Sequence, residues 1–264
     1  MRTGYSTADM HVHTTASDGT ATPRQVVEFV ATRTDLSVVA ICDHNTNEGA
    51  LEAAGYAHEY GIEIVIGQEV ESSQGHILGL WTPELVTPGR PAAETVANIQ
   101  AQGGLAVAAH PYAPRWWHKH GLCRGETCVY DNVGFDGVEV ANSTPLLLAA
   151  NFRARRYWRV NRDRLAATGG SDAHMLTVIG TSRTIFPGST AQDLRNAIES
   201  RTTTGYGPTF NPVRLFFYAR KVPEIKERDR DRKAREAERG VNGACAQCGD
   251  CEAAPLENST ADET

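Results

Sequence analysis

Short apolar runs alternate with longer amphipathic stretches over most of the chain. The apolar runs cover residues 9–13, 38–42, 62–67, 76–81, 105–109, 137–140 and 165–168. Their length is typical of strands, whereas the stretches 24–32, 47–60, 92–102, 146–161 and 190–200 have helical spacing. Strands that alternate with helices predict an α/β fold with a parallel sheet, open or closed.

Two of the expected helices carry start signals. Thr22 is a capping residue, and Pro23 follows it at the first helical position. Ser189 or Thr190 is a plausible cap before the helix at 191–200.

Composition narrows the class of protein. The chain has 264 residues, of which 41% are hydrophobic and 22% charged, so it can bury a proper core. No apolar run approaches the ~20 residues that span a bilayer, and the first ten residues lack the apolar stretch of a signal peptide. The expectation is a cytoplasmic protein with no membrane partner. The net charge of -6 argues against a general nucleic-acid coat protein, so no stable nucleic-acid complex is expected.

The last part of the chain differs from the rest, and we expect a domain at 1–220 followed by a separate segment at 221–264. Residues 221–240 hold eight basic and six acidic side chains with almost nothing apolar after Ile225, which predicts a solvated helix that buries little. Residues 240–264 carry five acids, no bases and three cysteines, which is typical of a flexible acidic tail.

Nearly every predicted strand is flanked by a histidine or a carboxylate. Such residues follow the runs as His11, His13, Asp43, His44, Glu69, His110, Asp172 and His174, while His76 precedes its run. Active sites of parallel sheets lie at the carboxyl ends of the strands, so these side chains are expected to gather at one edge. A single His-x-His motif is a weak signal of metal binding, but five predicted strands with such residues at the same edge favour a functional site.

The residue types point to a metal centre. His11 and His13 are two apart and would project from the same face of a strand. Imidazole and carboxylate ligands suit zinc, iron or manganese rather than calcium. The candidate ligands outnumber the four of one tetrahedral ion, so two or three divalent ions that share a carboxylate are the natural interpretation.

The order of these motifs resembles the polymerase and histidinol phosphatase (PHP) superfamily. The resemblance rests on His11-Val12-His13, Ser17-Asp18-Gly19, Asp43-His44, Glu69, His110-Pro111 and Gly170-Ser171-Asp172-Ala173-His174, and it spans about residues 8–207. It implies a distorted (β/α)7 barrel with a trinuclear metal centre at its carboxyl face. Asp18 stands where some relatives carry histidine, and the acid form looks like the small stand-alone phosphoesterase branch.

The resemblance also implies ligand sets. The first ion would be held by His11, His13, Glu69 and Asp172; the second by Glu69, His76 and His110; the third by Asp18, His44 and His174. Asp43 would orient a ligand histidine, and Glu139 and Asn142 would have a structural or orienting role.

Such a centre would hydrolyse a phosphomonoester of a small metabolite or nucleotide through a metal-bound hydroxide. Three alternatives stay open: a phosphodiesterase or 5′–3′ oligonucleotide exonuclease, a metal-dependent hydrolase of a non-phosphate ester, and a non-enzymatic module. The last is disfavoured because the ligand set is complete.

A phosphate pocket in an acidic protein needs local cations. The candidates are Arg183, which we also expect to act in catalysis with Asp43, together with Arg115, Arg153 and Arg156. The run that contains Arg153 and Arg156 could equally be a solvated helix face. Tyr112, Trp116 and Trp117 could stack on a nucleotide base.

The cysteines are a separate feature. Cys245, Cys248 and Cys251 have ligand-like spacing without a fourth neighbour, so an accessory zinc or iron–sulfur site is a hypothesis only. Cys123 and Cys128 could form a disulfide, bind metal or stay free. Cys42 is expected to be a small core residue.

Overall fold

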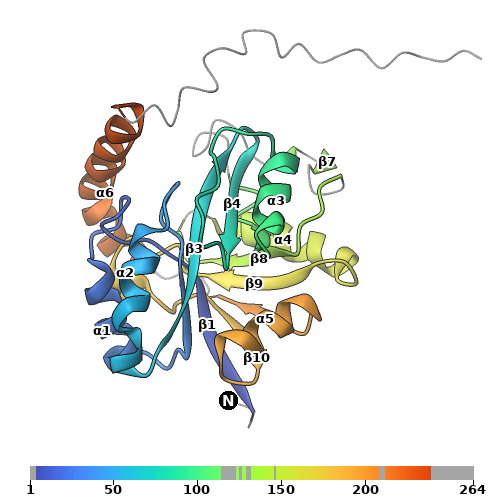
Figure 1. Cartoon of the computed structure of the whole chain (residues 1–264), viewed down its shortest axis with the longest axis horizontal. Coiled ribbons are helices and arrows are strands. Elements are labelled where there is room, and N and C mark those ends of the chain that lie inside the picture. The colour runs from blue at the N-terminus through green and yellow to red at the C-terminus, as the bar shows by residue number, and fades with distance from the viewer. Residues whose placement is uncertain are drawn as a thin grey trace, which may run out of the picture.

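The structure is a computed structural model that describes residues 4–113, 123–124, 127–128, 132–145, 147–207 and 212–238 (Figure 1). Arg115, Trp116, Trp117 and the three cysteines of the C-terminal segment lie outside the described residues, so the predictions made for them are not addressed.

A single mixed sheet organises the molecule. In chain order its strands are β1 (Tyr5–Val12), β2 (Val38–Ile41), β3 (Glu63–Ser72), β4 (Gly75–Leu80), β5 (Leu105–Ala108), β8 (Gly137–Asn142), β9 (Ala166–Gly170), β10 (Arg183–Pro187) and β11 (Thr204–Tyr206). Their order across the sheet is β11-β10-β1-β2-β3-β4-β5-β8-β9. Two short strands, β6 (Cys123–Arg124) and β7 (Thr127–Cys128), pair separately.

All seven predicted strands are present, but the sheet is not wholly parallel. β1–β2–β3 and β5–β8–β9 are parallel sets, whereas β4 runs antiparallel to both β3 and β5. The antiparallel step arises because only Ser73 and Gln74 connect β3 to β4, which is too short for a crossover helix. Two strands that we did not predict, β10 and β11, extend the sheet beyond β1.

The sheet curves until its ends nearly meet. Beyond β9, the amide of Ser171 donates to the Asp9 side chain at 2.8 Å, and the amide of Asp172 donates to the carbonyl of His11 at 2.8 Å. The amide of His13 in turn donates to the carbonyl of Ala173 at 3.0 Å. These bonds attach the end of β9 to β1 and make a nearly closed barrel, as the family resemblance implied.

The helices before α6 lie against the sheet close to their predicted positions. The helices are α1 (Pro23–Arg33), α2 (Glu48–Ala57) with the 3-10 turn His58–Tyr60, α3 (Ala92–Ala101), α4 (Leu148–Asn161), α5 (Ala191–Glu199) and α6 (Pro212–Glu238), with a further 3-10 turn at Leu176–Val178. Thr22 caps α1 and Thr190 caps α5, each through a capping box, as the start signals predicted.

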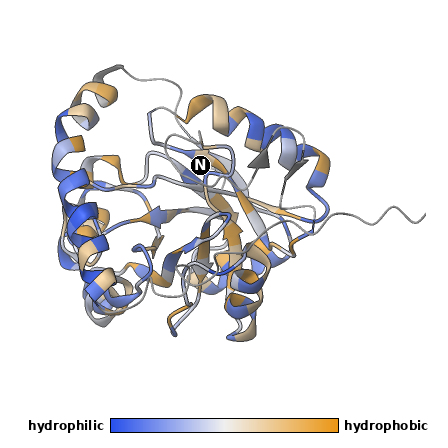
Figure 2. Ribbon diagram, turned by 90° about the horizontal axis from the view of Figure 1, so that it is seen from above, coloured by the Kyte–Doolittle hydropathy of each residue, from blue (hydrophilic) through white to orange (hydrophobic). Residues whose placement is uncertain are grey.

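Strand alternation divides the core. On β2 and directly after it, Val38, Ala40 and Cys42 pack with one cluster, and Val39 and Ile41 pack with another that contains residues of α1 and α2. The first cluster also takes in residues of α5, which places that helix against the sheet. Figure 2 shows the apolar colour gathered on the central strands. None of the helices in the described ranges is long and apolar enough to cross a membrane.

The charged C-terminal helix differs from its prediction in extent and in burial. α6 begins at Pro212 rather than near 221, and its Arg232 is only 3% exposed. The sequence predicted a helix that buries little, but one face of α6 packs over the barrel. The placement of a polar helix depends on ion pairs with residues distant in the chain, which its own sequence pattern does not reveal.

Candidate metal centre

The nine predicted ligands come together at the carboxyl ends of the parallel strands. His11 and Glu69 lie on β1 and β3, and the others follow β1, β2, β5 and β9. His76 comes from the start of β4, opposite Glu71. Because β4 is antiparallel, its beginning lies at the edge where its neighbours end, which explains why this histidine precedes its strand.

His11 and His13 form the centre of the cluster. Their Nε2 atoms are 3.1 Å apart, and both rings are buried. Nε2 of His13 lies 3.3 Å from both the Glu69 and the Asp172 carboxylates, while Nε2 of His11 lies 3.3 Å and 3.7 Å from the same two groups. Two imidazole nitrogens that face one another among carboxylates fit a shared cation.

Glu69 connects this group to a second one. Its Oε2 faces His11 and His13, whereas its Oε1 lies 2.8 Å from Nδ1 of His76 and 3.0 Å from Nε2 of His110. The carboxylate thus presents one oxygen to each group, which is the arrangement of a bridging ligand.

A third group surrounds Asp18. Its Oδ2 lies 3.1 Å from Nε2 of His174 and 3.9 Å from Nε2 of His44. The ring of His13 stacks on that of His174, with centroids 4.3 Å apart, so the third group adjoins the first.

Glu71 is a possible ligand that sequence reasoning missed. Its carboxylate belongs with His44 and His76 to a group whose ligand atoms lie within 4.8 Å of one another. Glu69 and Glu71 are two apart on β3, so the period-2 pattern that paired His11 with His13 could have identified it.

The electrostatics of the cluster favour bound cations. Burial alone would raise the pKa of Glu69, but the neighbouring histidines, His44 first, hold it well below its ordinary value. Burial likewise would lower the pKa of His13, yet the carboxylates of Asp172 and Glu69 raise it to about 10. In the metal-free protein His13 is therefore protonated, and its positive charge lies where the surrounding carboxylates favour a cation.

Two buried nitrogens support the same conclusion. Among the described residues, Nδ1 of His13 and Nδ1 of His44 find no hydrogen-bond partner, although Nδ1 of His44 lies 3.3 Å from the Glu69 carboxylate. Buried polar atoms normally make hydrogen bonds, so imidazole nitrogens that lack one beside carboxylates fit a site that binds divalent ions.

Surrounding side chains fix the orientation of the ligands. Nδ1 of His11 donates to Glu139 at 3.2 Å, which turns Nε2 of that ring toward the centre. The same carboxylate accepts from the backbone amide of His110 at 2.8 Å and from Asn142 at 3.0 Å. Glu139 therefore positions ligands that belong to different strands.

Asp172 and the loop after β1 are held in a similar way. Oδ2 of Asp172 accepts from Asn142 at 3.2 Å and from Thr144 at 3.1 Å, which leaves Oδ1 directed at the two central histidines. Asp43 accepts from the amide and hydroxyl of Thr14, each at 2.7 Å, and from Ser17 at 2.5 Å. Asp43 thus fixes the loop that carries Asp18.

Two of the candidate ligands are among the five described residues other than glycine that have a positive φ. His110 has φ 25° and Asp172 has φ 54°, in the left-handed region that residues other than glycine rarely adopt. Strain of this kind persists only where the surroundings enforce it, and it is frequent at functional sites.

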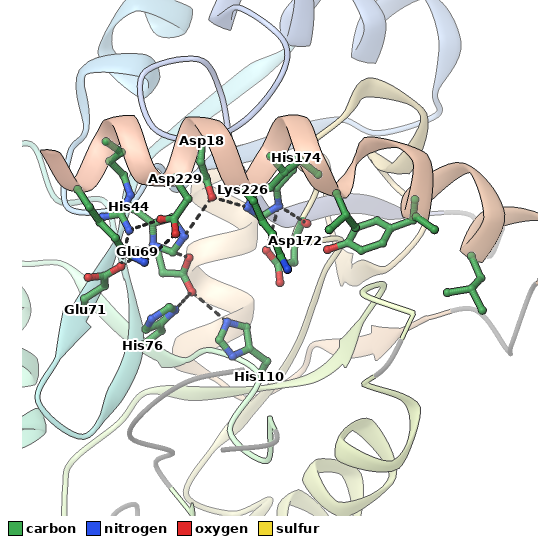
Figure 3. Close-up of a pocket in the computed structure, with 17 residues that line it drawn as sticks. Asp18, His44, Glu69, Glu71, His76, His110, Asp172, His174, Lys226 and Asp229 are labelled. Carbon is green, nitrogen blue, oxygen red and sulfur yellow. Dashed lines mark hydrogen bonds and ion pairs between the residues drawn. The ribbon is translucent and has the colours of Figure 1, made fainter. Parts of the chain in front are cut away.

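A cavity of about 510 Å³ opens onto the centre. One side is formed by ligand residues, including Asp172 and His174, and the other by a face of α6 that contributes Tyr218 and Lys226 (Figure 3). Among the described residues, the lysines and the arginine that line it are Lys226, Arg232 and Lys233, and these come from α6.

The three described arginines that were proposed for phosphate binding lie elsewhere. Arg183, on β10, pairs with Asp35 at 2.6 Å and lines a different depression. Arg153 and Arg156 are exposed on α4, and neither lines the cavity. Sequence reasoning missed Lys226 because the helix that carries it reaches the site only through tertiary contacts.

Family models match most of the chain. Residues 9–154 match the model described as PHP domain, and residues 149–203 match the model described as PHP-associated.

Curated relatives agree with this match. An uncharacterised protein of Methanocaldococcus jannaschii is 37% identical over 147 residues, which are 52% of this chain and 81% of that protein. The 3′,5′-nucleoside bisphosphate phosphatase of Chromobacterium violaceum is 38% identical over 104 residues, or 38% of this chain. The matched region spans only 35% of the length of that phosphatase.

The fold has solved counterparts. A two-domain protein from Bacteroides vulgatus, described as containing a predicted PHP-like metal-dependent phosphoesterase, superposes with a TM-score of 0.62 at 20% identity. The superposition covers 78% of this chain and 66% of the other. The superposition shows a shared fold, and the family match over more than half of the sequence shows that the chain belongs to the PHP domain family.

Proposed function

We propose that this protein is a phosphomonoesterase that acts on a small phosphorylated metabolite or nucleotide with two or three divalent ions bound at the described centre. The observation that carries the proposal is the pair of Nε2 atoms of His11 and His13, 3.1 Å apart and enclosed by the carboxylates of Glu69 and Asp172. A centre of this kind binds anionic oxygens, and phosphate monoesters offer three of them.

The distances support three ligand sets, of which the first two share Glu69. The first is His11, His13, Glu69 and Asp172, the second Glu69, His76 and His110, and the third Asp18, His44 and His174. In this proposal Glu69 bridges the first two sites through its separate oxygens. Zinc, manganese and iron each suit this set of imidazole and carboxylate ligands.

Ions held by these residues would lower the pKa of a coordinated water and would neutralise negative charge on the phosphoryl oxygens. The chain's own residues supply orientation. Glu139 and Asn142 keep His11 and Asp172 directed at the centre through hydrogen bonds of 3.0–3.2 Å. Lys226 supplies a positive charge on the opposite wall of the cavity, where it can bind a phosphoryl oxygen or a second phosphate.

A monoester substrate is favoured over the diester alternative by the surroundings of the cavity. α6 crosses it, so a substrate has to fit between that helix and the ligand residues. The activity of the bisphosphate phosphatase relative, which removes phosphate from a small nucleotide according to its name, is consistent with this choice.

Three chromogenic esters test the proposal. Protein loaded separately with manganese, zinc or iron is assayed with p-nitrophenyl phosphate, bis-p-nitrophenyl phosphate and p-nitrophenyl acetate. We expect the monoester to be hydrolysed fastest, and Asp172→Asn to reduce that rate at least ~100-fold through loss of metal. Faster turnover of the diester would replace the proposal by a phosphodiesterase, and turnover of the acetate alone would replace it by a carboxylic ester hydrolase.

A further inference from the structure

Helix α6 lies across the mouth of the metal centre. The residues of α6 that line the cavity recur every three or four positions, which is the spacing of one helix face. They are Leu215, Tyr218, Ala219, Val222, Ile225, Lys226, Asp229, Arg232 and Lys233. Figure 3 shows the α6 ribbon running past His44, Asp18 and His174. The helix thus forms one wall of the site through most of its length.

The ligands beneath this helix are scarcely exposed. The side chains of His76 and His174 are 13% and 12% exposed, and Glu69 is 1% exposed. A phosphoesterase centre has to admit its substrate, so the position of α6 decides what can reach these residues.

One buried cation fastens α6 to the barrel. The guanidinium of Arg232 lies 2.8 Å from Glu71 of β3, and 2.7 Å from both Asp229 and Glu236 of its own helix. Asn45 completes the arrangement, because its Nδ2 donates to Glu236 at 3.3 Å and its Oδ1 accepts from the amide of Glu71 at 3.0 Å. We name these five residues the Arg232 cluster.

The Arg232 cluster contains one positive charge and is incompletely satisfied. Three carboxylates share this guanidinium, and Asp229 also pairs with Lys233 at 2.7 Å, so removal of the guanidinium would leave Glu71 and Glu236 as like charges on the two sides of the contact between α6 and β3. Within the described part of the chain, Nε of Arg232 and Oε2 of Glu236 are buried and have no hydrogen-bond partner. A partly satisfied polar cluster stabilises less than a complete one, which suits a contact that opens.

We propose that α6 is a cover that selects substrates by size and is held closed by the Arg232 cluster. Beneath it, the cavity of about 510 Å³ accepts a phosphate ester with a small leaving group. A phosphate at the end of an oligonucleotide reaches the ligands only when α6 moves away. This inference rests on the proposed phosphomonoesterase activity and names the substrate class of the same site.

The test compares two monoesters that undergo the same reaction and differ in the size of the leaving group. Metal-loaded full-length protein is assayed with p-nitrophenyl phosphate and with a 5′-phosphorylated decanucleotide, and kcat/KM is measured for each. The variant Arg232→Ala should raise the ratio of the decanucleotide value to the small-substrate value at least tenfold.

Arg228→Ala is the matched control. Arg228 is also on α6, pairs with Glu224 at 3.7 Å and does not line the cavity, so this change should leave the ratio at its wild-type value. Hydrogen exchange of the peptides in 212–238 gives a second measurement that needs no turnover. Exchange should accelerate in Arg232→Ala and not in Arg228→Ala.

The outcomes separate the two proposals. Faster exchange with an unchanged ratio overturns selection by size, and unchanged exchange overturns the role of the Arg232 cluster. If wild-type protein hydrolyses neither monoester, the proposed phosphomonoesterase activity fails. Size selection is then tested by binding: Arg232→Ala should strengthen binding of the decanucleotide relative to p-nitrophenyl phosphate at least tenfold, as measured by the two Kd values. A circular dichroism melt establishes that each variant is folded.

Discussion

At the scale of single residues, the centre depends on side chains that aim the ligands as much as on the ligands. Glu139 contacts His11, the amide of His110 and Asn142, so one carboxylate links three parts of the site. Such partners set the direction and basicity of a ligand imidazole.

Glu139→Gln tests this role. The amide can still accept one hydrogen bond, but it no longer stabilises the Nδ1 proton of His11 through its charge, so we expect metal affinity to fall about 10–100-fold. Titration calorimetry with zinc measures the change. Glu94→Gln, an exposed glutamate on α3 paired with Arg90 at 3.6 Å, is the control, and equal losses in both variants would contradict the assignment.

Lys226 is the residue that we expect to contact the substrate phosphate. Arg232 and Lys233 are engaged by carboxylates 2.7 Å away, whereas Lys226 makes no ion pair within the described part of the chain. Lys226→Ala should raise KM for p-nitrophenyl phosphate about tenfold with a smaller effect on kcat, equivalent to about 1.4 kcal/mol.

The comparison for Lys226 is Lys221→Ala. Lys221 lies on the same helix, pairs with Glu224 at 2.7 Å and is absent from the cavity wall. A KM that rises equally in both variants would show that general charge, rather than contact with the substrate, is responsible.

Most of the ligands were predictable at this scale, because each stands at a strand end with a residue type that binds metals. The spacing of His11 and His13 and the sequence around Asp172 are recognisable as ligand motifs without a structure. Glu71 and Lys226 were not predicted. Glu71 stands two residues after Glu69 on the same strand and was overlooked. Lys226 belongs to a helix whose position the local sequence pattern does not specify.

At the scale of elements, the close approach of β9 to β1 brings Asp172 and His11 together. Gly170 makes that approach possible, because a Cβ at this position would come within 2.8 Å of the Glu139 carboxylate and would overlap with the Cβ of His11. The predicted strand at 165–168 did not reveal this requirement, since its closing contact is with the first strand of the chain.

Two glycine substitutions test the packing. Gly170→Ala should lower the free energy of unfolding by about 1–3 kcal/mol, because a methyl group has to be inserted between β9 and β1. Gly55→Ala in α2 meets nothing within 4 Å and should raise it by about 0.5–1 kcal/mol, since alanine is the better helix former. Urea denaturation measures both, and a neutral Gly170→Ala would show that the two strands can separate without cost.

The predicted elements agree with the structure wherever a hydrophobic pattern is sufficient to define them. The differences are β10 and β11, which are short and join the sheet through neighbours rather than through a strong pattern of their own, and the direction of β4. The burial of Arg232 on α6 is likewise not visible in the local pattern, because its ion pair with Glu71 joins residues 161 positions apart in the sequence.

At the scale of the whole molecule, metal binding is coupled to protonation and to stability. Burial opposes a charge on His13, but the carboxylates of Asp172 and Glu69 raise its pKa to about 10, so at pH 7 the metal-free ring holds a proton that an entering ion displaces. In the metal-free protein this histidine contributes stability that is present below pH 6.5 and is lost as the pH rises through about 10.

We therefore expect zinc or manganese to bind more tightly at pH 8 than at pH 6.5 and to release protons on binding. Because the unfolded chain lacks the site, saturating metal should also raise the melting temperature of EDTA-treated protein. Calorimetry in two buffers of different ionisation enthalpy measures the proton release, and differential scanning calorimetry measures the shift. Affinity that does not change with pH would contradict the protonated state of His13.

The sequence by itself determined the seven strands, the helices between them, the family and the ligand types, because each of these is encoded by a local pattern or by a residue at a strand end. Only the tertiary structure decided which oxygen of Glu69 faces which histidine, how β9 closes onto β1, and that a charged helix covers the site. Those features depend on contacts between segments far apart in the chain, where the energy of a residue is set by its neighbours in space rather than by its neighbours in sequence.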